Sequence, residues 1–236
     1  DRFLDQHVHA GLKGRHPHAV VQQGGHGDAH RLHLGQQRVV VGEPAAAELL
    51  DRQAAAPLIG VGHPDQLGIA QYLTRFGLAV DEPGILDAGK NDWLNDPRWQ
   101  VLRRLVEDTL VMKDPIEMFV AQNLALDGLL YPLVYGSFID EHLTLKGGTA
   151  VAMLTSFMPE WHDECARWVD AVVKTCAAES DENKQLITEW VKAWADRSQA
   201  ALAPVAEIAL GEHGQEALAE VRSAFNARVG KLGITL

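Results

Sequence analysis

The sequence lacks the features that mark several large classes of protein. It has two cysteines in 236 residues, and no apolar run approaches the roughly 20 residues that span a membrane. It has no Gly-rich phosphate loop after a strand and no cysteine set for an iron–sulfur cluster. The formal net charge is −11, with no basic stripe along the chain. These absences argue against a membrane protein, a nucleotide site and binding to nucleic acid or anionic membrane surfaces.

The two cysteines do not form a disulfide with each other. Cys165 and Cys176 lie on one predicted helix, about 16 Å apart at 1.5 Å per residue, which is too far for a bridge while that helix is intact. The start of the sequence carries no signal-peptide pattern. We therefore expect a cytoplasmic protein.

The composition divides the chain near residue 64. Residues 1–63 are rich in His, Gly and Gln, hold eight of the eleven histidines and carry six basic and six acidic side chains. Residues 64–236 carry 15 Lys/Arg and 26 Asp/Glu, which accounts for the whole net charge. We expect residues 1–63 to be a divergent segment that is disordered, truncated or misread, because it offers little apolar surface to offset its ordering entropy. Its histidines also suggest metal binding, but no Cys or clustered carboxylate accompanies them.

Residues 64–236 have helical periodicity throughout. Apolar spacing predicts a helix over 65–80, and capping pairs open further helices at Asp96-Pro97 and Asp114-Pro115. Further helices are expected over 150–179, from Ser180 to Leu210 and over 215–231, with kinks at the prolines that fall inside helices. These are Pro132, Pro159 and Pro204. Long helices with short connections predict an all-α antiparallel bundle.

The sequence Glu164-Cys-Ala-Arg167 resembles a di-iron motif that has lost a ligand. Ferritin-like carboxylate proteins hold two irons with Glu-x-x-His pairs, because residues three apart share one helix face. Here Arg167 stands at the histidine position, and a guanidinium has no lone pair for a cation. We expect Arg167 to be buried and paired with neighbouring carboxylates, Asp170 among them. No intact Glu-x-x-His occurs in the chain.

An apolar stripe precedes and follows this motif. Its members lie three, four or seven residues apart, so we expect them to form one buried helix face. They are Met153, Phe157, Trp161, Trp168 and Val172. His162 and His142 stand apart from other ligand types, and each is interpreted as a surface or satisfied histidine.

Seven short blocks of sequence after residue 64 carry a family resemblance. They begin at Leu67 (LGIAQYLTRFGL), Asp96 (DPRWQ), Leu102 (LRRLVED), Ala121 (AQNLALDGLL), Val151 (VAMLT), Arg167 (RWVDA) and Glu220 (EVRSAF). In this order they closely resemble the β subunit of the hydroxylase component of bacterial multicomponent soluble di-iron monooxygenases. The phenol hydroxylase branch is the most similar, with toluene and alkene or alkane monooxygenases as relatives. The resemblance covers residues 65–236, and residues 1–63 do not resemble the longer N-terminal part of such subunits.

The resemblance implies a ferritin-like fold whose metal site is lost and a subunit that is not catalytic alone. It implies an α subunit that holds the di-iron centre and the substrate pocket, and a γ subunit, in a dimer of αβγ units. Electrons from NADH pass through a reductase with FAD and a 2Fe-2S cluster, and a regulatory protein controls coupling. No catalytic, cofactor or metal residue is then expected in this chain.

We expect part of the α-subunit interface to lie on two predicted helices. The first carries Gln71, Tyr72 and Arg75, and the second carries Trp99 and Arg104. Two other functions remain open: a ferritin-like protein that holds its own iron through carboxylates, and a stand-alone helical scaffold or His-rich metal-binding protein. Iron analysis of the purified chain distinguishes the first, and co-purification with a larger Glu-x-x-His chain distinguishes the second.

Overall fold

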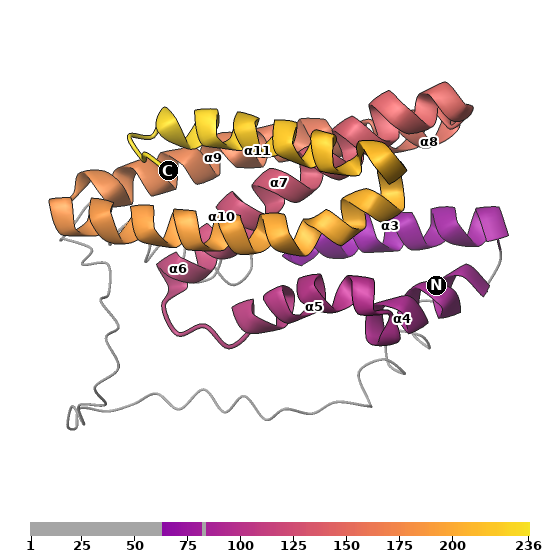
Figure 1. Ribbon diagram of the computed structural model, residues 1–236, viewed down its shortest axis with the longest axis horizontal. Coiled ribbons are helices and arrows are strands. Elements are labelled where there is room, and N and C mark those ends of the chain that lie inside the picture. The colour runs from indigo at the N-terminus through magenta and orange to yellow at the C-terminus, as the bar shows by residue number, and fades with distance from the viewer. Residues whose placement is uncertain (1–62, 82–83) are drawn as a thin grey trace. The chain divides into compact units, whose positions relative to one another are not determined.

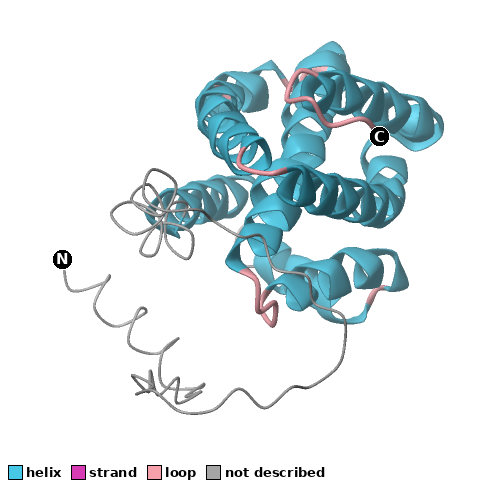
Figure 2. Ribbon diagram, turned by 90° about the vertical axis from the view of Figure 1, so that its left-hand side faces the viewer, coloured by secondary structure: helices cyan, strands magenta, loops and turns pink. Residues whose placement is uncertain are grey.

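A computed structural model describes residues 63–81 and 84–236, and every regular element in these ranges is a helix (Figures 1 and 2). This confirms the predicted all-α bundle of long helices. The prediction for residues 1–63 falls outside the described residues, apart from His63, where the first described helix begins. Among the described residues no helix is long and apolar enough to cross a membrane.

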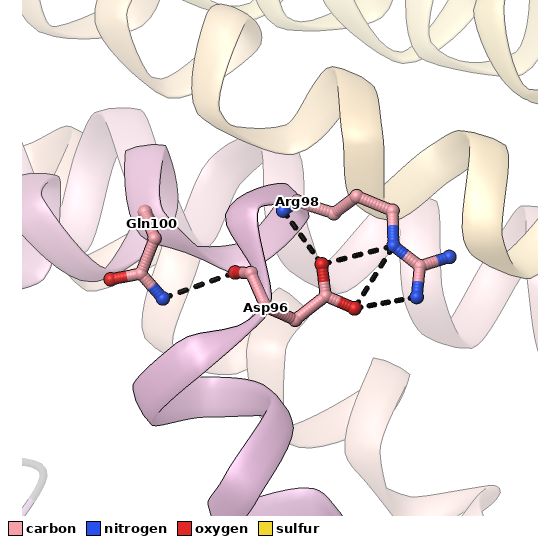
Figure 3. Close-up of polar contacts among 3 residues, drawn as sticks. All are labelled: Asp96, Arg98 and Gln100. Atoms are coloured by element: carbon pink, nitrogen blue, oxygen red, sulfur yellow. Dashed lines mark hydrogen bonds and ion pairs between the residues drawn. The ribbon is translucent and has the colours of Figure 1, made fainter.

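The first three described helices pack in chain order, and an N-cap residue fixes the corner between the second and the third. The helices are α3 (His63–Asp81), α4 (Gly84–Asn95) and α5 (Pro97–Thr109). The helix α4 was not predicted. Asp96 caps α5 as expected, since its carboxylate accepts from the Arg98 N–H at 2.9 Å and from the Arg98 guanidinium (Figure 3). This contact lowers the pKa of Asp96. Gln100 closes the corner by donating to the Asp96 carbonyl at 3.1 Å (Figure 3).

One long helical run crosses the centre of the bundle. It consists of α6 (Pro115–Phe119), the π-helix η1 (Val120–Leu126), α7 (Asp127–Tyr131) and the π-helix η2 (Pro132–Leu143). Sequence analysis predicted a kink at Pro132, and in the structure a π-helix begins at this residue. Proline has no N–H to donate, and the change to i→i+5 bonding accommodates the missing donor. A short 3-10 turn, η3 (Thr144–Lys146), ends the run, and Gly147 adopts a positive φ of 90°.

The C-terminal half consists of α8 (Thr149–Thr155), α9 (Phe157–Ala178), α10 (Asp181–Leu210), the 3-10 turn η4 (Gly211–His213) and α11 (Gly214–Gly230). Ser180 caps α10 as predicted, accepting from the Asn183 N–H at 3.0 Å. Sequence analysis predicted one helix with a kink at Pro159. The structure instead interrupts the helix at Ser156, which leaves Pro159 in the first turn of α9, where its missing N–H costs nothing. Figure 1 shows α10 and α11 as neighbouring helices joined by a tight turn.

The predicted apolar stripe on α8 and α9 is wrong by part of a helical turn. Met153 is 72% exposed and Phe157 is 41% exposed, while Trp161, Trp168 and Val172 are half-buried. The buried face of α9 consists of Met158, His162, Val169, Val173, Cys176 and Ala177. The break at Ser156 resets the helical phase, so α8 and α9 do not share one continuous face. A hydrogen bond ties α6 to α10: the Glu117 carboxylate accepts from the Trp194 indole N–H at 3.1 Å.

Candidate subunit interface and the polar centre of the bundle

The three candidate interface residues of α3 differ in how much of each side chain is exposed and available to a partner. Gln71 and Arg75 are exposed in the single chain. Tyr72 is half-buried, its hydroxyl donates to the Leu154 carbonyl at 2.7 Å, and its ring meets Phe157 edge to face at 5.3 Å. Tyr72 therefore holds α3 against α8 and α9. It offers a partner only the remainder of its ring, whereas Gln71 and Arg75 remain available.

The two candidates on α5 also have different surroundings. Trp99 is half-buried and packs against Trp93 of α4, with ring centroids 6.4 Å apart. Arg104 is exposed, and no hydrogen bond or ion pair with another described residue fixes its guanidinium. The arginine next to it, Arg103, is held by Glu107 at 2.8 Å. The available side chain on this helix is thus Arg104, while Trp99 supports the α4–α5 corner.

Exposed apolar side chains surround the contact made by Tyr72. They are Leu73, Met153, Leu154 and Phe157, which are 39–72% exposed in the single chain. Tyr72 contacts Leu154 and Phe157 directly, and Leu73 and Met153 are the neighbours in sequence of Tyr72 and Leu154, so all four belong to the junction of α3, α8 and α9. Clustered exposed apolar residues commonly mark contact surfaces. The α3 candidates therefore lie beside apolar surface that sequence analysis had assigned in part to the core.

The structure does not bring Glu164 and Arg167 into the bundle. Both residues are exposed on α9, so the expectation that Arg167 is buried among carboxylates is wrong. The residues that face inward on this stretch of α9 are His162, Val169 and the partly buried Asp170. A Glu-x-x-Arg spacing indicates that two side chains share a helix face, but it does not indicate whether that face is buried. Here the face is exposed.

The carboxylate that does face inward is paired with an arginine from another helix. Arg228 of α11 donates to Asp170 of α9, with Nε 2.9 Å from one carboxylate oxygen and 3.2 Å from the other. Its terminal nitrogen lies 2.8 Å from the carboxylate and also donates to the Ala166 carbonyl at 3.2 Å. A bidentate guanidinium is a strong partner for a carboxylate. Asp170 is therefore satisfied by Arg228 and not by Arg167.

His162 is the least satisfied polar group of this region. Its imidazole is buried and stacks on Tyr131 of α7, with centroids 5.0 Å apart and planes 9° from parallel. Its Nε2 is buried without a hydrogen-bond partner. The interpretation of His162 as a surface or satisfied histidine is therefore wrong. It lies four residues after Met158 and seven before Val169, and this helical spacing could have identified it as inward-facing.

We expect the stability of the protein to fall below pH 6.5 because of His162. Burial, and then the Arg228 guanidinium, lower its pKa, so the folded state favours the neutral imidazole. The unfolded chain therefore binds more protons as the pH falls below about 6.5, and each further pH unit costs up to about 1.4 kcal/mol until the folded pKa is reached. The measurement is urea unfolding at pH 5.0 and 7.5 for the natural chain and for His162→Phe. If the free energy of unfolding changes by the same amount between the two pH values in both proteins, this role of His162 is contradicted.

The described residues do not offer a di-iron centre. Within residues 63–81 and 84–236 no three His, Cys, Asp or Glu side chains are grouped so that they could hold a metal ion. The chemistry of Asp170 and His162 agrees, because Asp170 is already occupied by a guanidinium and His162 is about two turns away from it on the same helix. What this region can do is join α9, α7 and α11 through an ion pair and a ring stack.

Comparisons with known proteins identify a family and several relatives of this chain. The sequence profile of the methane/phenol/alkene hydroxylase family matches residues 39–180, so the match begins within the segment that composition sets apart. The chain is 51% identical over 172 residues to the oxygenase component DmpL of phenol 2-monooxygenase from Pseudomonas sp. (strain CF600). It is 41% identical over 172 residues to the corresponding component MhpL from Acinetobacter pittii (strain PHEA-2). Each match covers 72% of this chain and 51% of the relative.

A third relative and a solved structure agree with these matches. The chain is 27% identical over 127 residues to the hydroxylase component subunit beta of the toluene-4-monooxygenase system of Ectopseudomonas mendocina, covering 52% of this chain and 38% of the relative. The crystal structure of xenon-pressurised phenol hydroxylase from Pseudomonas sp. OX1 has a chain that is 41% identical, with a TM-score of 0.67 over 73% of this chain and 52% of that chain. The chain thus spans about half the length of the phenol 2-monooxygenase components that it matches.

Proposed function

Because the chain belongs to the methane/phenol/alkene hydroxylase family, we propose that it is the non-catalytic β subunit of a multicomponent phenol hydroxylase. The observation that carries the proposal is its 51% identity to the oxygenase component DmpL of a phenol 2-monooxygenase. The similarity to a hydroxylase subunit beta of a toluene monooxygenase supports the choice of subunit. In this role the chain acts in the cytoplasm as part of an oxidoreductase.

The di-iron chemistry belongs to a partner α subunit in this proposal. The donors of the described region do not fit a pair of irons, since no three of them are grouped to hold a metal ion and Asp170 is already held by Arg228, which cannot ligate a cation. FAD and the 2Fe-2S cluster belong to the NADH reductase, and the γ subunit completes each αβγ unit. What this chain contributes is a rigid helical surface, held together by the apolar core and by the Asp170–Arg228 ion pair.

Two surfaces of the described region are the candidates for contact with α. One carries Gln71 and Arg75 of α3 next to exposed apolar side chains, and the other carries Arg104 of α5. Permanent subunit interfaces bury large and fairly apolar areas, typically above about 2,000 Å². Exposed leucine, methionine and phenylalanine side chains beside α3 are of the kind that such an interface covers.

Co-expression with a phenol hydroxylase α subunit tests the proposed function. We expect the two chains to co-purify in equal amounts, and we expect phenol hydroxylation with O₂, NADH, the reductase and the regulatory protein to require both chains. The chain alone should show no turnover with any reductant. Turnover by this chain alone, or failure of the two chains to form a complex, would contradict the proposal. Replacing both Gln71 and Arg75 by Ala should weaken the complex without changing the thermal unfolding of the single chain.

A further inference from the structure

One partly buried carboxylate of the long central run of helices has no counter-charge among the described residues. Asp127 begins α7, at the junction with the π-helix η1. Its neighbours along the chain are buried almost completely: Leu124, Ala125, Leu126, Gly128 and Leu129. Asp127 itself is half-buried, so part of the residue is exposed to solvent in the single chain.

Within the described residues, no hydrogen bond or ion pair satisfies this side chain. The backbone N–H of Asp127 is committed to the Gln122 carbonyl, five residues earlier, as the helix continues from η1. Burial alone raises the pKa of Asp127 to about 7, and no neighbouring cation lowers it. A partly buried carboxylate without a partner is unfavourable, because it loses hydration without gaining an ion pair.

Asp127 lies on a helix face that the rest of the described chain leaves partly open. Asn123, Leu130 and Val134 are spaced four or three residues apart from it and from each other, and all are half-buried. We name these four residues the α7 strip. The strip carries one amide, one acid and two aliphatic side chains, so a complementary surface would be apolar with a single cation.

Other partly buried acids of the chain show the arrangement that Asp127 lacks. Asp170 is bound by Nε and a terminal nitrogen of Arg228 from α11. Asp96, at the start of α5, is bound by Arg98. At both places the arginine comes from the chain itself. Both carboxylate oxygens of Asp127 are uncommitted, which suits a guanidinium better than an ammonium because the planar fork can reach both oxygens.

We propose that the α7 strip is a contact surface for the hydroxylase α subunit, which places an arginine side chain against Asp127 in the assembled enzyme. This inference rests on the proposed function and adds to it a location and a partner chemistry. The argument is charge complementarity: an unpaired, partly buried acid amid apolar surface is completed by a cation that the described chain does not supply. Such a pair orients the two chains as well as joining them.

The test is Asp127→Asn, measured in the single chain and in the complex with α. Asparagine keeps the shape and removes the charge. The raised pKa means that the natural chain loses stability as the pH rises from about 4 to about 7. At pH 8 the melting temperature of the variant alone should therefore exceed that of the natural chain by at least about 2–4 °C. In the complex the same variant should bind α at least about tenfold more weakly, since it loses the ion pair.

Asp140→Asn is the matched control, because Asp140 lies on the same helical run, is exposed and undergoes the same change of charge. It should alter neither the melting temperature of the single chain nor the affinity for α. An arginine of α that pairs with Asp127 should be revealed by charge exchange: Asp127→Arg should abolish assembly, and Arg→Asp at one position of α should restore it.

The outcomes separate this inference from the proposed function. If the natural chain does not bind α, both fail together. If natural chain and Asp127→Asn bind α equally well, the α7 strip is not the contact, although the subunit assignment stands. If Asp127→Asn lowers the melting temperature of the single chain at pH 8, a cation of this chain already pairs with Asp127, and the inference is overturned.

Discussion

Replacing Arg228 by alanine should destabilise the single chain by about 2–3 kcal/mol. The substitution leaves Asp170 without its bidentate partner and the Ala166 carbonyl without its second donor. Breaking a fully buried ion pair costs about 3–5 kcal/mol, and we expect less here because both side chains keep some exposure to solvent. The measurement is urea unfolding at pH 7.5, fitted with a common slope.

Arg167→Ala is the control for this prediction. It also removes an arginine side chain, but from an exposed position of α9, one turn from Asp170. It should change the free energy of unfolding by less than about 0.5 kcal/mol. Equal effects for the two arginines would mean that the ion pair between α9 and α11 contributes nothing specific. A large effect for Arg167 alone would restore the arrangement expected from the Glu-x-x-Arg spacing.

Replacing Gly128 by leucine should destabilise the chain by about 3 kcal/mol or more. A Cβ at Gly128 would lie 3.2 Å from the Phe225 ring and 3.3 Å from the Arg228 guanidinium, so a larger side chain must push α11 away from α7. That movement disturbs the core around Phe225 and the Asp170–Arg228 pair together, which places the cost at or beyond the usual 1–3 kcal/mol of overpacking.

Gly136→Leu is the matched control for that substitution. Gly136 lies on the same helical run, and nothing stands within 4 Å of a Cβ built there. Leucine has the higher helix propensity, so we expect no loss of stability and a gain of up to about 1 kcal/mol. Thermal and urea unfolding of the two variants give the comparison. A similar loss at both positions would indicate that the π-helical backbone, and not the contact with α11, sets the cost.

The parts of the fold that depend on short stretches of sequence could be predicted. Asp96-Pro97, Asp114-Pro115 and Ser180 each begin a helix in the structure, because a cap is decided by residues two or three positions away. The helix α4 was missed because its 12 residues contain two glycines, Gly84 and Gly89, and follow no cap signal. Local signals thus located most helices but not their relative packing.

The buried face of α9 and its ion pair could not be predicted in the same way. The stripe was extended through Ser156 as though one helix crossed it, which placed Met153 and Phe157 inward when both are exposed. Arg228 is 58 residues from Asp170, so no spacing rule connects them. Only the packing of α11 on α9 decides that Arg228, and not the adjacent Arg167, reaches the carboxylate.

The central claim is that this chain supports a di-iron subunit without holding iron itself. The most direct measurement is the iron content of each chain after the purified complex with α is separated under mild conditions, together with the iron content of the chain expressed alone in iron-supplemented medium. We expect about two irons to remain with each α subunit and less than about 0.1 with this chain, because Arg228 occupies Asp170 and no three donor side chains of the described residues are grouped to hold a metal ion. One or more tightly bound irons per copy of this chain, in either preparation, would contradict the account.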